Sequence, residues 1–257
     1  MPSGALTVVG TGIRLITQIT LEARAAIQDA EKVFYTADGP VQRRWLEQLN
    51  PTAESLEHLY QLGRDRLSTY DEMVERALSE ARSGVRVCLV MYGHPGVLVT
   101  PAHEAIRRAR AEGIRATMLP GVSAEDCLFA DLGLDPGARG CQTFEATDFL
   151  VQRRRFDPRS ALVLYQIAAI GIRAHTLALP NIHGLRALTA ALVAHYPSEH
   201  EAIVYTAAEY PGCPPLLTPT TLDALPEATV LPTSTLYVPP LDEAPADPDA
   251  YLALVSP

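Results

Sequence analysis

Two tyrosines and an arginine, Tyr60, Arg66 and Tyr70, could together remove a proton from a weakly acidic group. A phenol with a pKa of about 10 is a poor base at neutral pH, but a guanidinium held beside it favours the phenolate and lowers that pKa. A permanently charged arginine can also stabilise an oxyanion. On spacing alone we favour a plainer interpretation, in which Tyr70 anchors an apolar helix face and Arg66 is solvated.

An amphipathic helix is expected to position these groups, because apolar residues recur at helical spacing from Tyr70 onward. Ser68 and Asp71 resemble a weak capping box at its start, and Gly84 stands where a helix-ending glycine belongs. Arg66 and Tyr70 are four residues apart, so they share a face once they are helical. The first tyrosine precedes the helix and must reach in from a loop.

The composition indicates a globular protein that is long enough for two modest domains. The chain has 257 residues, of which 47% are hydrophobic and 20% charged. Its formal net charge of -9 argues against a nucleic-acid partner, because phosphate neutralisation needs a basic surface. Two arginine-rich runs, at 107–110 and 153–155, are solvated faces in the plainer interpretation; the alternative is an anchor for an acidic peptide.

The four cysteines form no CxxC pair, which supports neither a zinc site nor a disulfide framework. No His, Cys and carboxylate cluster has the spacing of metal ligands, so we expect no metal. The N-terminus lacks the charged and apolar regions of a signal peptide, and no apolar run approaches membrane-spanning length. We therefore expect a cytoplasmic protein without a membrane partner.

Strand-like runs alternate with helical patterns, which is typical of an α/β fold with a largely parallel sheet. Strands are expected at 5–9, 32–36, 85–91 and 115–119, and helices at 20–30, 41–48, 101–112 and 123–131. Later strand runs, at 160–167, 200–208 and 233–240, have longer connections. We expect two α/β domains, at 1–119 and 120–240, and a proline-rich acidic tail at 241–257 that is mobile or forms an arm.

Two glycine loops follow expected strands. Gly10 and Gly12 come after the first strand, but a dinucleotide fingerprint would need a third glycine where Leu15 stands. The second loop, "YGHPGV" at 92–97, lies at the carboxyl end of a strand, where open α/β sheets bind ligands. Its histidine, His94, could be a base, but we favour a structural imidazole.

These loops, together with "LPGVSAEDCLFADLG" at 119–133, resemble the tetrapyrrole methylase superfamily of S-adenosylmethionine-dependent methyltransferases. Within it, the chain is similar to the borosin peptide-backbone α-N-methyltransferases over residues 5 to 240. The matching blocks are "LTVVGTGIRLITQITLEA", "KVFYT", "YGHPGVLVTPAHEAI", "MLPGVSAEDCLFADLGLDPGARGCQTFEATDFL" and "LVLYQI". The resemblance implies two α/β domains with the cofactor bound in the cleft between them.

The resemblance also implies roles for single residues. Tyr60, Arg66 and Tyr70 match a tyrosine, an arginine and a tyrosine of the borosin active site, and so would be catalytic. The family has another tyrosine three positions before the first, where this chain has Glu57. The S-adenosyl-L-methionine site would comprise Gly10, Gly12, Tyr92, His94, Pro95, Gly96, Val97, Ser123, Ala124, Gln166, Tyr205 and Ala207.

The implied reaction explains why such groups are needed. A peptide nitrogen is a poor nucleophile because its lone pair is delocalised into the carbonyl. Methylating it requires removal of the N–H proton and stabilisation of charge on the carbonyl oxygen. We expect one tyrosine, preferably Tyr70, to be the base, while Arg66 and Tyr60 position the amide and stabilise the oxyanion.

Fungal family members carry their substrate fused behind the catalytic domain, whereas this sequence stops at Pro257. We therefore expect a precursor peptide supplied in trans, with a chain cut before a fused substrate as the alternative, and a homodimer like those of the family. Two other functions stay open. One is a methyltransferase acting on a tetrapyrrole or another small molecule, although a pyrrole carbon needs no deprotonating tyrosine. The other is a non-catalytic protein that binds a peptide or the cofactor.

Overall fold

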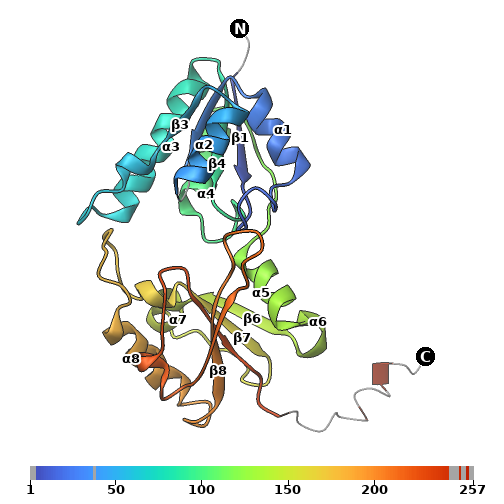
Figure 1. The fold of residues 1–257 in the computed structure, drawn as a ribbon, viewed down its shortest axis with the longest axis vertical. Coiled ribbons are helices and arrows are strands. Elements are labelled where there is room, and N and C mark those ends of the chain that lie inside the picture. Colours follow the sequence, from blue (N-terminus) through green and yellow to red (C-terminus); the bar gives the residue numbers. More distant parts are fainter. Residues whose placement is uncertain (1–3, 37–38, 243–248, 250–252, 255–257) are drawn as a thin grey trace.

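The structure is a computed structural model, and it describes residues 4–36, 39–242, 249 and 253–254. The chain forms two five-stranded sheets, each with its own helices, and the two halves lie end to end (Figure 1). The α/β fold predicted from the sequence is confirmed. The tail expected at 241–257 lies mostly outside the described residues.

The first sheet is entirely parallel, with the strand order β3-β2-β4-β1-β5. Its strands are β1 (Ala5–Gly10), β2 (Lys32–Tyr35), β3 (Ala53–Ser55), β4 (Arg86–Met91) and β5 (Arg115–Met118). The central strands β1 and β4 are neighbours, and Gly10 is paired with Met91 at their ends. The loops that follow β1 and β4 therefore begin at the same edge of the sheet.

Helices cover both faces of this sheet. They are α1 (Leu21–Asp29), α2 (Pro40–Leu49), α3 (Arg66–Arg82) and α4 (Thr100–Ala111), with a short 3-10 helix, η1 (Glu57–Leu59). Leu89 of β4 faces α3 and α4, whereas Cys88 and Val90 face α1 and α2. Successive strand side chains point to opposite faces, so a strand covered on both sides is apolar throughout.

Helix α3 starts earlier than the sequence suggested. The predicted cap at Ser68 is wrong: Asp65 is the N-cap, and its side chain accepts the Ser68 N–H at 3.1 Å. Aspartate caps a helix as well as serine does, and the carboxylate stands three residues before that amide. Arg66 is consequently the first helical residue and lies one turn before Tyr70. At the other end, Gly84 has a φ of 99°, as a helix-ending glycine does.

The second sheet is mixed, with the strand order β6-β7-β10-β8-β9. Its strands are β6 (Cys141–Glu145), β7 (Ala161–Tyr165), β8 (Glu201–Thr206), β9 (Leu216–Thr221) and β10 (Thr235–Val238). Only β6 and β7 are parallel; the other neighbours run antiparallel. The expectation of a largely parallel sheet thus holds for the first sheet only, because β8 and β9 are joined without a crossover helix.

The second half also has its own helices and core. The helices are α5 (Ala124–Leu132), α6 (Pro136–Arg139), α7 (Ala146–Val151) and α8 (Ile182–Leu192), with 3-10 turns η2 (Ile167–Ala169) and η3 (Leu225–Glu227). The domain boundary predicted at residue 120 falls between β5 and α5 and stays a prediction. In the described part of the chain, no helix combines the length and the hydrophobicity that crossing a bilayer requires.

Candidate functional site

The two glycine loops are bonded directly to each other. The Gly12 N–H donates to the Gly93 carbonyl oxygen at 3.2 Å, and the Gly93 N–H donates back to Gly12 at 3.1 Å. A Cβ atom on Gly10 would lie 2.0 Å from the same Gly93 oxygen. The loops can approach this closely only because neither has a side chain at the contact. Glycine at these positions is therefore required by packing, whether or not a ligand binds.

The segment before α5 joins the same junction. Gly121 lies against it, since a Cβ there would be 3.1 Å from the Gly93 oxygen. Ser123 is nearly fully buried and caps α5: its hydroxyl donates to the Asp126 carboxylate at 2.7 Å and accepts the Asp126 N–H at 3.2 Å. The structure thus gathers three segments that the sequence predicted as one ligand-binding region.

The "GHPG" turn is held by its own histidine. His94 Nδ1 accepts the Gly96 N–H at 2.9 Å, and the Val97 N–H donates to the His94 carbonyl at 3.1 Å. The Gly96 carbonyl in turn bonds the ring of His103 at 2.9 Å. Pro95 packs beside Gly10 at the loop junction. These hydrogen bonds indicate that the His94 imidazole stabilises the GHPG turn.

Four other predicted cofactor residues belong to a cluster shared by both halves. Tyr92, Ala124 and Ala207 pack around the buried Ile13 and Tyr205. The Tyr205 hydroxyl donates to the Asp131 carboxylate at 2.7 Å, and burial together with that carboxylate raises the pKa of Tyr205. The Tyr205 hydroxyl is therefore already engaged by Asp131.

Gln166 is the remaining predicted cofactor residue. It follows β7, is exposed, and has a left-handed φ of 57°. A non-glycine residue rarely adopts this conformation, and such residues concentrate at functional sites. Its exposed side chain and strained backbone are the features expected of a group that contacts a ligand.

A narrow pocket opens at the junction of the two halves, with a volume of about 20 Å³. The Leu15 N–H closes one wall by donating to the Glu209 carbonyl at 2.7 Å. Sequence reasoning missed Glu209 and Tyr210, although they directly follow the "VYTAA" run; it also missed the buried Gln42. The lining residues are Ile13, Leu15, Val41, Gln42, Tyr92, Glu209 and Tyr210.

This lining has no cationic side chain, but it has two phenols, an amide and a carboxylate. A sulfonium cofactor favours aromatic faces and oxygens over further cations, so the donor set fits S-adenosylmethionine. The space itself has room for about one water molecule and must widen for a nucleoside. Among the described residues, no group of three His, Cys, Asp or Glu side chains could hold a metal ion.

The predicted catalytic residues lie around the start of α3. Tyr60 ends η1, and its ring centroid is 5.5 Å from that of His175 in the second half. Tyr60 and Tyr70 are both half-buried against the core cluster of the first half. The Arg66 N–H donates to the Arg173 carbonyl at 3.1 Å. In this described region, the Arg66 guanidinium and the Tyr70 hydroxyl are not hydrogen-bonded to each other.

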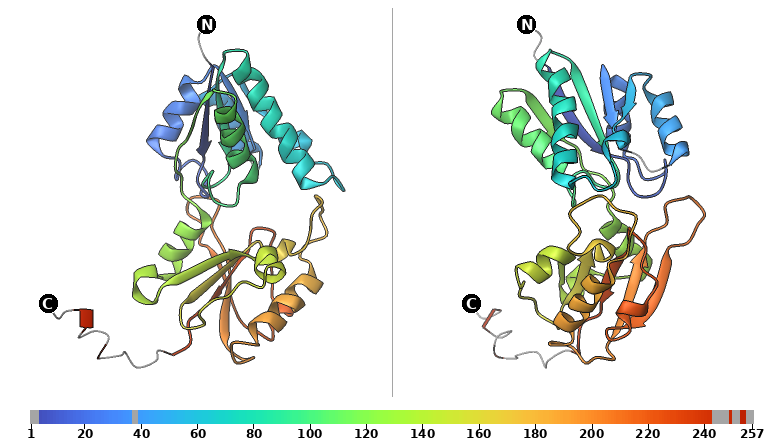
Figure 2. Two further views of the ribbon diagram at one scale, coloured as in Figure 1. Left: turned by 180° about the vertical axis from the view of Figure 1, so that it is seen from behind. Right: turned by 90° about the vertical axis from the view of Figure 1, so that its left-hand side faces the viewer.

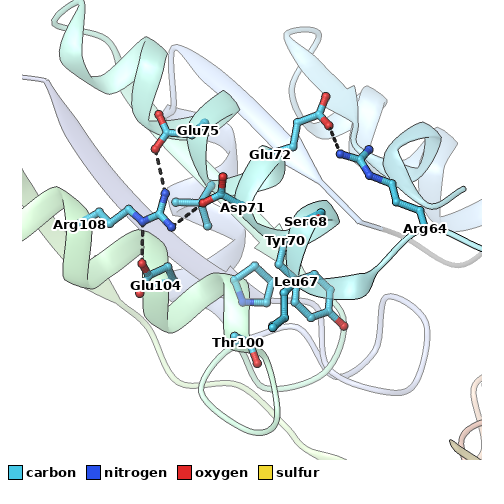
Figure 3. A pocket seen from close by; sticks show the side chains of 12 residues that line it. Arg64, Leu67, Ser68, Tyr70, Asp71, Glu72, Glu75, Thr100, Glu104 and Arg108 are labelled. Carbon is cyan, nitrogen blue, oxygen red and sulfur yellow. Dashed lines mark hydrogen bonds and ion pairs between the residues drawn. The ribbon is translucent and has the colours of Figure 1, made fainter. Parts of the chain in front are cut away.

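Tyr70 lines a pocket of about 830 Å³ between α3 and α4 (Figure 3). Tyr70, Leu67 and Thr100 gather at one end of it. At the other end Arg108 forms ion pairs with three carboxylates, those of Asp71, Glu75 and Glu104. Arg64 also lines the pocket and pairs with Glu72 at 2.6 Å.

Two arginines, Arg64 and Arg108, line this pocket with Tyr70, whereas Arg66 is not among its lining residues. Sequence reasoning missed Arg64. The signal was available in "GRDR", where two arginines flank the helix cap. Arg64 is neutralised by Glu72, whereas Arg66 forms no ion pair with any residue of the described ranges. The structure therefore leaves the Arg66 charge available.

Solved structures share this two-sheet architecture. The uroporphyrin-III-C-methyltransferase of Thermus thermophilus aligns with a TM-score of 0.64, covering 92% of this chain and 92% of that one at 20% sequence identity. The likeness shows the fold. Residues 5–208 match the family of Tetrapyrrole (Corrin/Porphyrin) Methylases, and the chain belongs to that family.

Curated relatives are closer in sequence. The chain is 42% identical over 242 residues to the methyltransferase/ribosomally synthesized cyclic peptide omphalotin A precursor of Omphalotus olearius, covering 93% of this chain and 58% of that protein. It is 40% identical over 244 residues to a type I borosin precursor methyltransferase of Coprinopsis marcescibilis, covering 93% and 62%. The resemblance to borosin methyltransferases is confirmed, and the chain spans about three fifths of the length of these relatives.

Proposed function

We propose that the protein is an S-adenosylmethionine-dependent methyltransferase that α-N-methylates backbone amides of a ribosomally made precursor peptide. The observation that carries the proposal is its 42% identity, over 93% of the chain, to a methyltransferase fused to a peptide precursor. Tyr60, Arg66 and Tyr70 all lie around the start of α3, and groups of these types suit amide deprotonation, which is consistent with the proposal.

The cofactor is proposed to bind where the glycine loops meet the second half. Tyr92, Val97, Gln166 and Ala207 would hold it, with Glu209 near its positive charge. When bound, S-adenosylmethionine supplies an electrophilic methyl group on a sulfonium. Calorimetry in the presence of a chelator should show saturable binding of the cofactor. Methyl transfer that the chelator abolishes would contradict a site without metal.

The base is proposed to be Tyr70. Its phenol lines a pocket large enough for a peptide segment, and the half-buried ring fixes its orientation. Arg66 stands one helical turn before Tyr70 and is not neutralised by any described carboxylate; in this proposal its charge favours the phenolate and the negative charge on the amide oxygen. Tyr60 donates to that oxygen from the other side of the helix start. Deprotonation restores the nitrogen lone pair as a nucleophile, and the methyl group can then be transferred to it.

The direct test is methylation of a peptide followed by mass spectrometry. The probe is the part of the omphalotin A precursor protein that lies outside the matched region, supplied as a separate peptide with S-adenosylmethionine. The expected result is a series of mass increments, one per methyl group, that fragmentation assigns to backbone nitrogens. Methyl groups on side chains only, or transfer to uroporphyrinogen III instead of any peptide, would overturn the proposal.

The same assay bears on how the substrate is delivered. Turnover of the separate peptide would support supply in trans; turnover only when the peptide is fused to the protein would contradict it. A homodimer is also proposed, on the family resemblance. Light scattering should give twice the chain mass of 27.8 kDa, and a stable mass of 27.8 kDa would contradict the dimer.

A further inference from the structure

A loop of the second half is bonded to the segment that carries the predicted catalytic residues. The His175 N–H donates to the Arg64 carbonyl at 2.9 Å, and the Gly63 N–H donates to the His175 carbonyl at 2.9 Å. Next to these bonds, Asp65 and Ala174 form an antiparallel bridge. The loop at 171–180 rises from the second half toward the start of α3 (Figure 1, and from behind in Figure 2).

The base of this loop is fixed to its own half. The Asn181 side chain donates to the Ile170 carbonyl at 2.7 Å, and its N–H donates to the Ala168 carbonyl at 2.9 Å. The Gly171 N–H donates to the Thr147 hydroxyl at 3.0 Å. The loop is therefore held at its base and at its tip, so its tip residue is placed by both halves of the protein.

That tip residue faces a predicted catalytic group. The rings of His175 and Tyr60 lie 5.5 Å apart at 45°, a tilted aromatic contact. Tyr60 follows η1 and is outside α3, so the helix does not fix its orientation. The ring of His175 packs on it from the opposite half, and the backbone bonds on either side keep His175 in register.

We propose that His175 is a positioning residue of the active site, whose ring holds the Tyr60 phenol in the orientation that the substrate amide requires. The proposal rests on the proposed function of Tyr60. In this proposal the loop at 171–180 helps to assemble the site. The second half contributes His175, which contacts a predicted catalytic residue of the first half. Losing an aromatic contact of this kind is expected to lower turnover about tenfold, since each misoriented donor weakens stabilisation of the transition state.

The test compares His175→Ala, which removes the ring, with His175→Phe, which keeps an aromatic ring at the contact. Leu177→Ala is the matched control, because Leu177 lies in the same loop and is 80% exposed. Turnover number and KM are measured separately on the omphalotin A precursor peptide. Cofactor affinity and melting temperature are measured in parallel. The Tyr60 ring resonance, assigned by its loss in Tyr60→Phe, is followed by NMR with labelled tyrosine.

The expected result is a roughly tenfold fall in turnover number for His175→Ala at unchanged cofactor affinity, with most activity restored in His175→Phe. The Tyr60 resonance should shift in the alanine variant and stay in place in the Leu177 control. Wild-type turnover by His175→Ala, or equal loss in His175→Ala and His175→Phe, would overturn the proposal. An inactive wild type would overturn the proposed function instead, and an unshifted Tyr60 resonance would still refute the positioning contact.

Discussion

The backbones of Gly12 and Gly93 exchange two hydrogen bonds, so the loops that follow β1 and β4 are one unit. Each glycine has a positive φ, of 73° and 71°, which other residues rarely adopt. The unit sits at the edge where parallel strands end, and Gly121 closes its third side. The loop backbone at this edge is therefore preorganised, so a ligand could bind there without rearranging it.

The first prediction concerns this contact. Gly10→Ala should lower the melting temperature by several degrees, because its Cβ would lie 2.0 Å from a backbone oxygen, and overpacking of this kind costs about 1–3 kcal/mol or more. Differential scanning calorimetry measures it. Gly137→Ala is the control, since the closest atom to a Cβ there is a side-chain oxygen of Asp135 at 3.2 Å and not a backbone atom. Equal melting of the Gly10 variant and the wild type would contradict the packing argument.

The second prediction concerns the base. Tyr70→Phe should abolish methyl transfer and leave cofactor affinity unchanged, because the hydroxyl acts only in the transition state. The phenylalanine ring can still pack against the core, so the melting temperature should equal that of the wild type. Peptide mass spectrometry and calorimetry give the two measurements. Activity at the wild-type level in this variant would remove Tyr70 from the mechanism.

The third prediction distinguishes two arginines. Arg66→Lys should slow turnover at least tenfold, because lysine keeps the charge but loses the planar fork. Arg64→Lys should stay near the wild-type rate, since lysine can still pair with Glu72. Steady-state kinetics of both variants on one peptide decides between them. The opposite order would show that Arg64, which lines the same pocket as Tyr70, is the functional cation.

The fourth prediction concerns pH. Hydrogen bonds from Arg107 and Arg108 lower the pKa of Glu104 to about 2, from an ordinary value of 4.5. Because this pKa is depressed in the folded state, its contribution to stability is present above pH 4.5 and is lost as the pH falls to about 2. Glu104→Gln should therefore be less stable than the wild type at neutral pH and equally stable near pH 2.

Denaturant unfolding across that pH range measures the difference. Glu80→Gln is the control, because Glu80 lies on the neighbouring helix and forms no ion pair among the described residues. Its stability should follow the wild type at every pH. A constant gap between Glu104→Gln and the wild type from neutral pH to pH 2 would contradict the assignment.

Much of the first sheet could be predicted from the sequence. Strands such as β2 and β4 are covered on both faces, so they appear as unbroken apolar runs that are bounded by polar turns. Strand β9 was missed because it lies at an edge and is largely exposed, and its sequence "LLTPTT" contains a proline that edge strands tolerate. The cap of α3 was misplaced because Asp65 and Ser68 both suit that role.

The site was predictable where its residues are neighbours in the chain. Glycine spacing and strand ends identified the loops at Gly12 and Gly93, because local geometry demands those residue types. His175 and Glu209 could not be found in this way. Their positions depend on how the second half meets the first, and no local pattern encodes a contact between segments so far apart in the chain.

The place of β10 in the second sheet has a consequence for synthesis on the ribosome. Among the strands of the described residues it is the last in the chain, yet it lies between β7 and β8. The first sheet is complete once residue 118 has emerged, so that half can fold while translation continues. The second sheet cannot be completed until Thr235–Val238 has been synthesised, because β10 joins β7 to β8. A chain that stalls before this point would leave the backbone N–H and C=O groups of β7 and β8 unpaired along the edges that β10 covers in the complete sheet. Such unpaired edges can pair with another chain, so a stalled chain would be prone to aggregation.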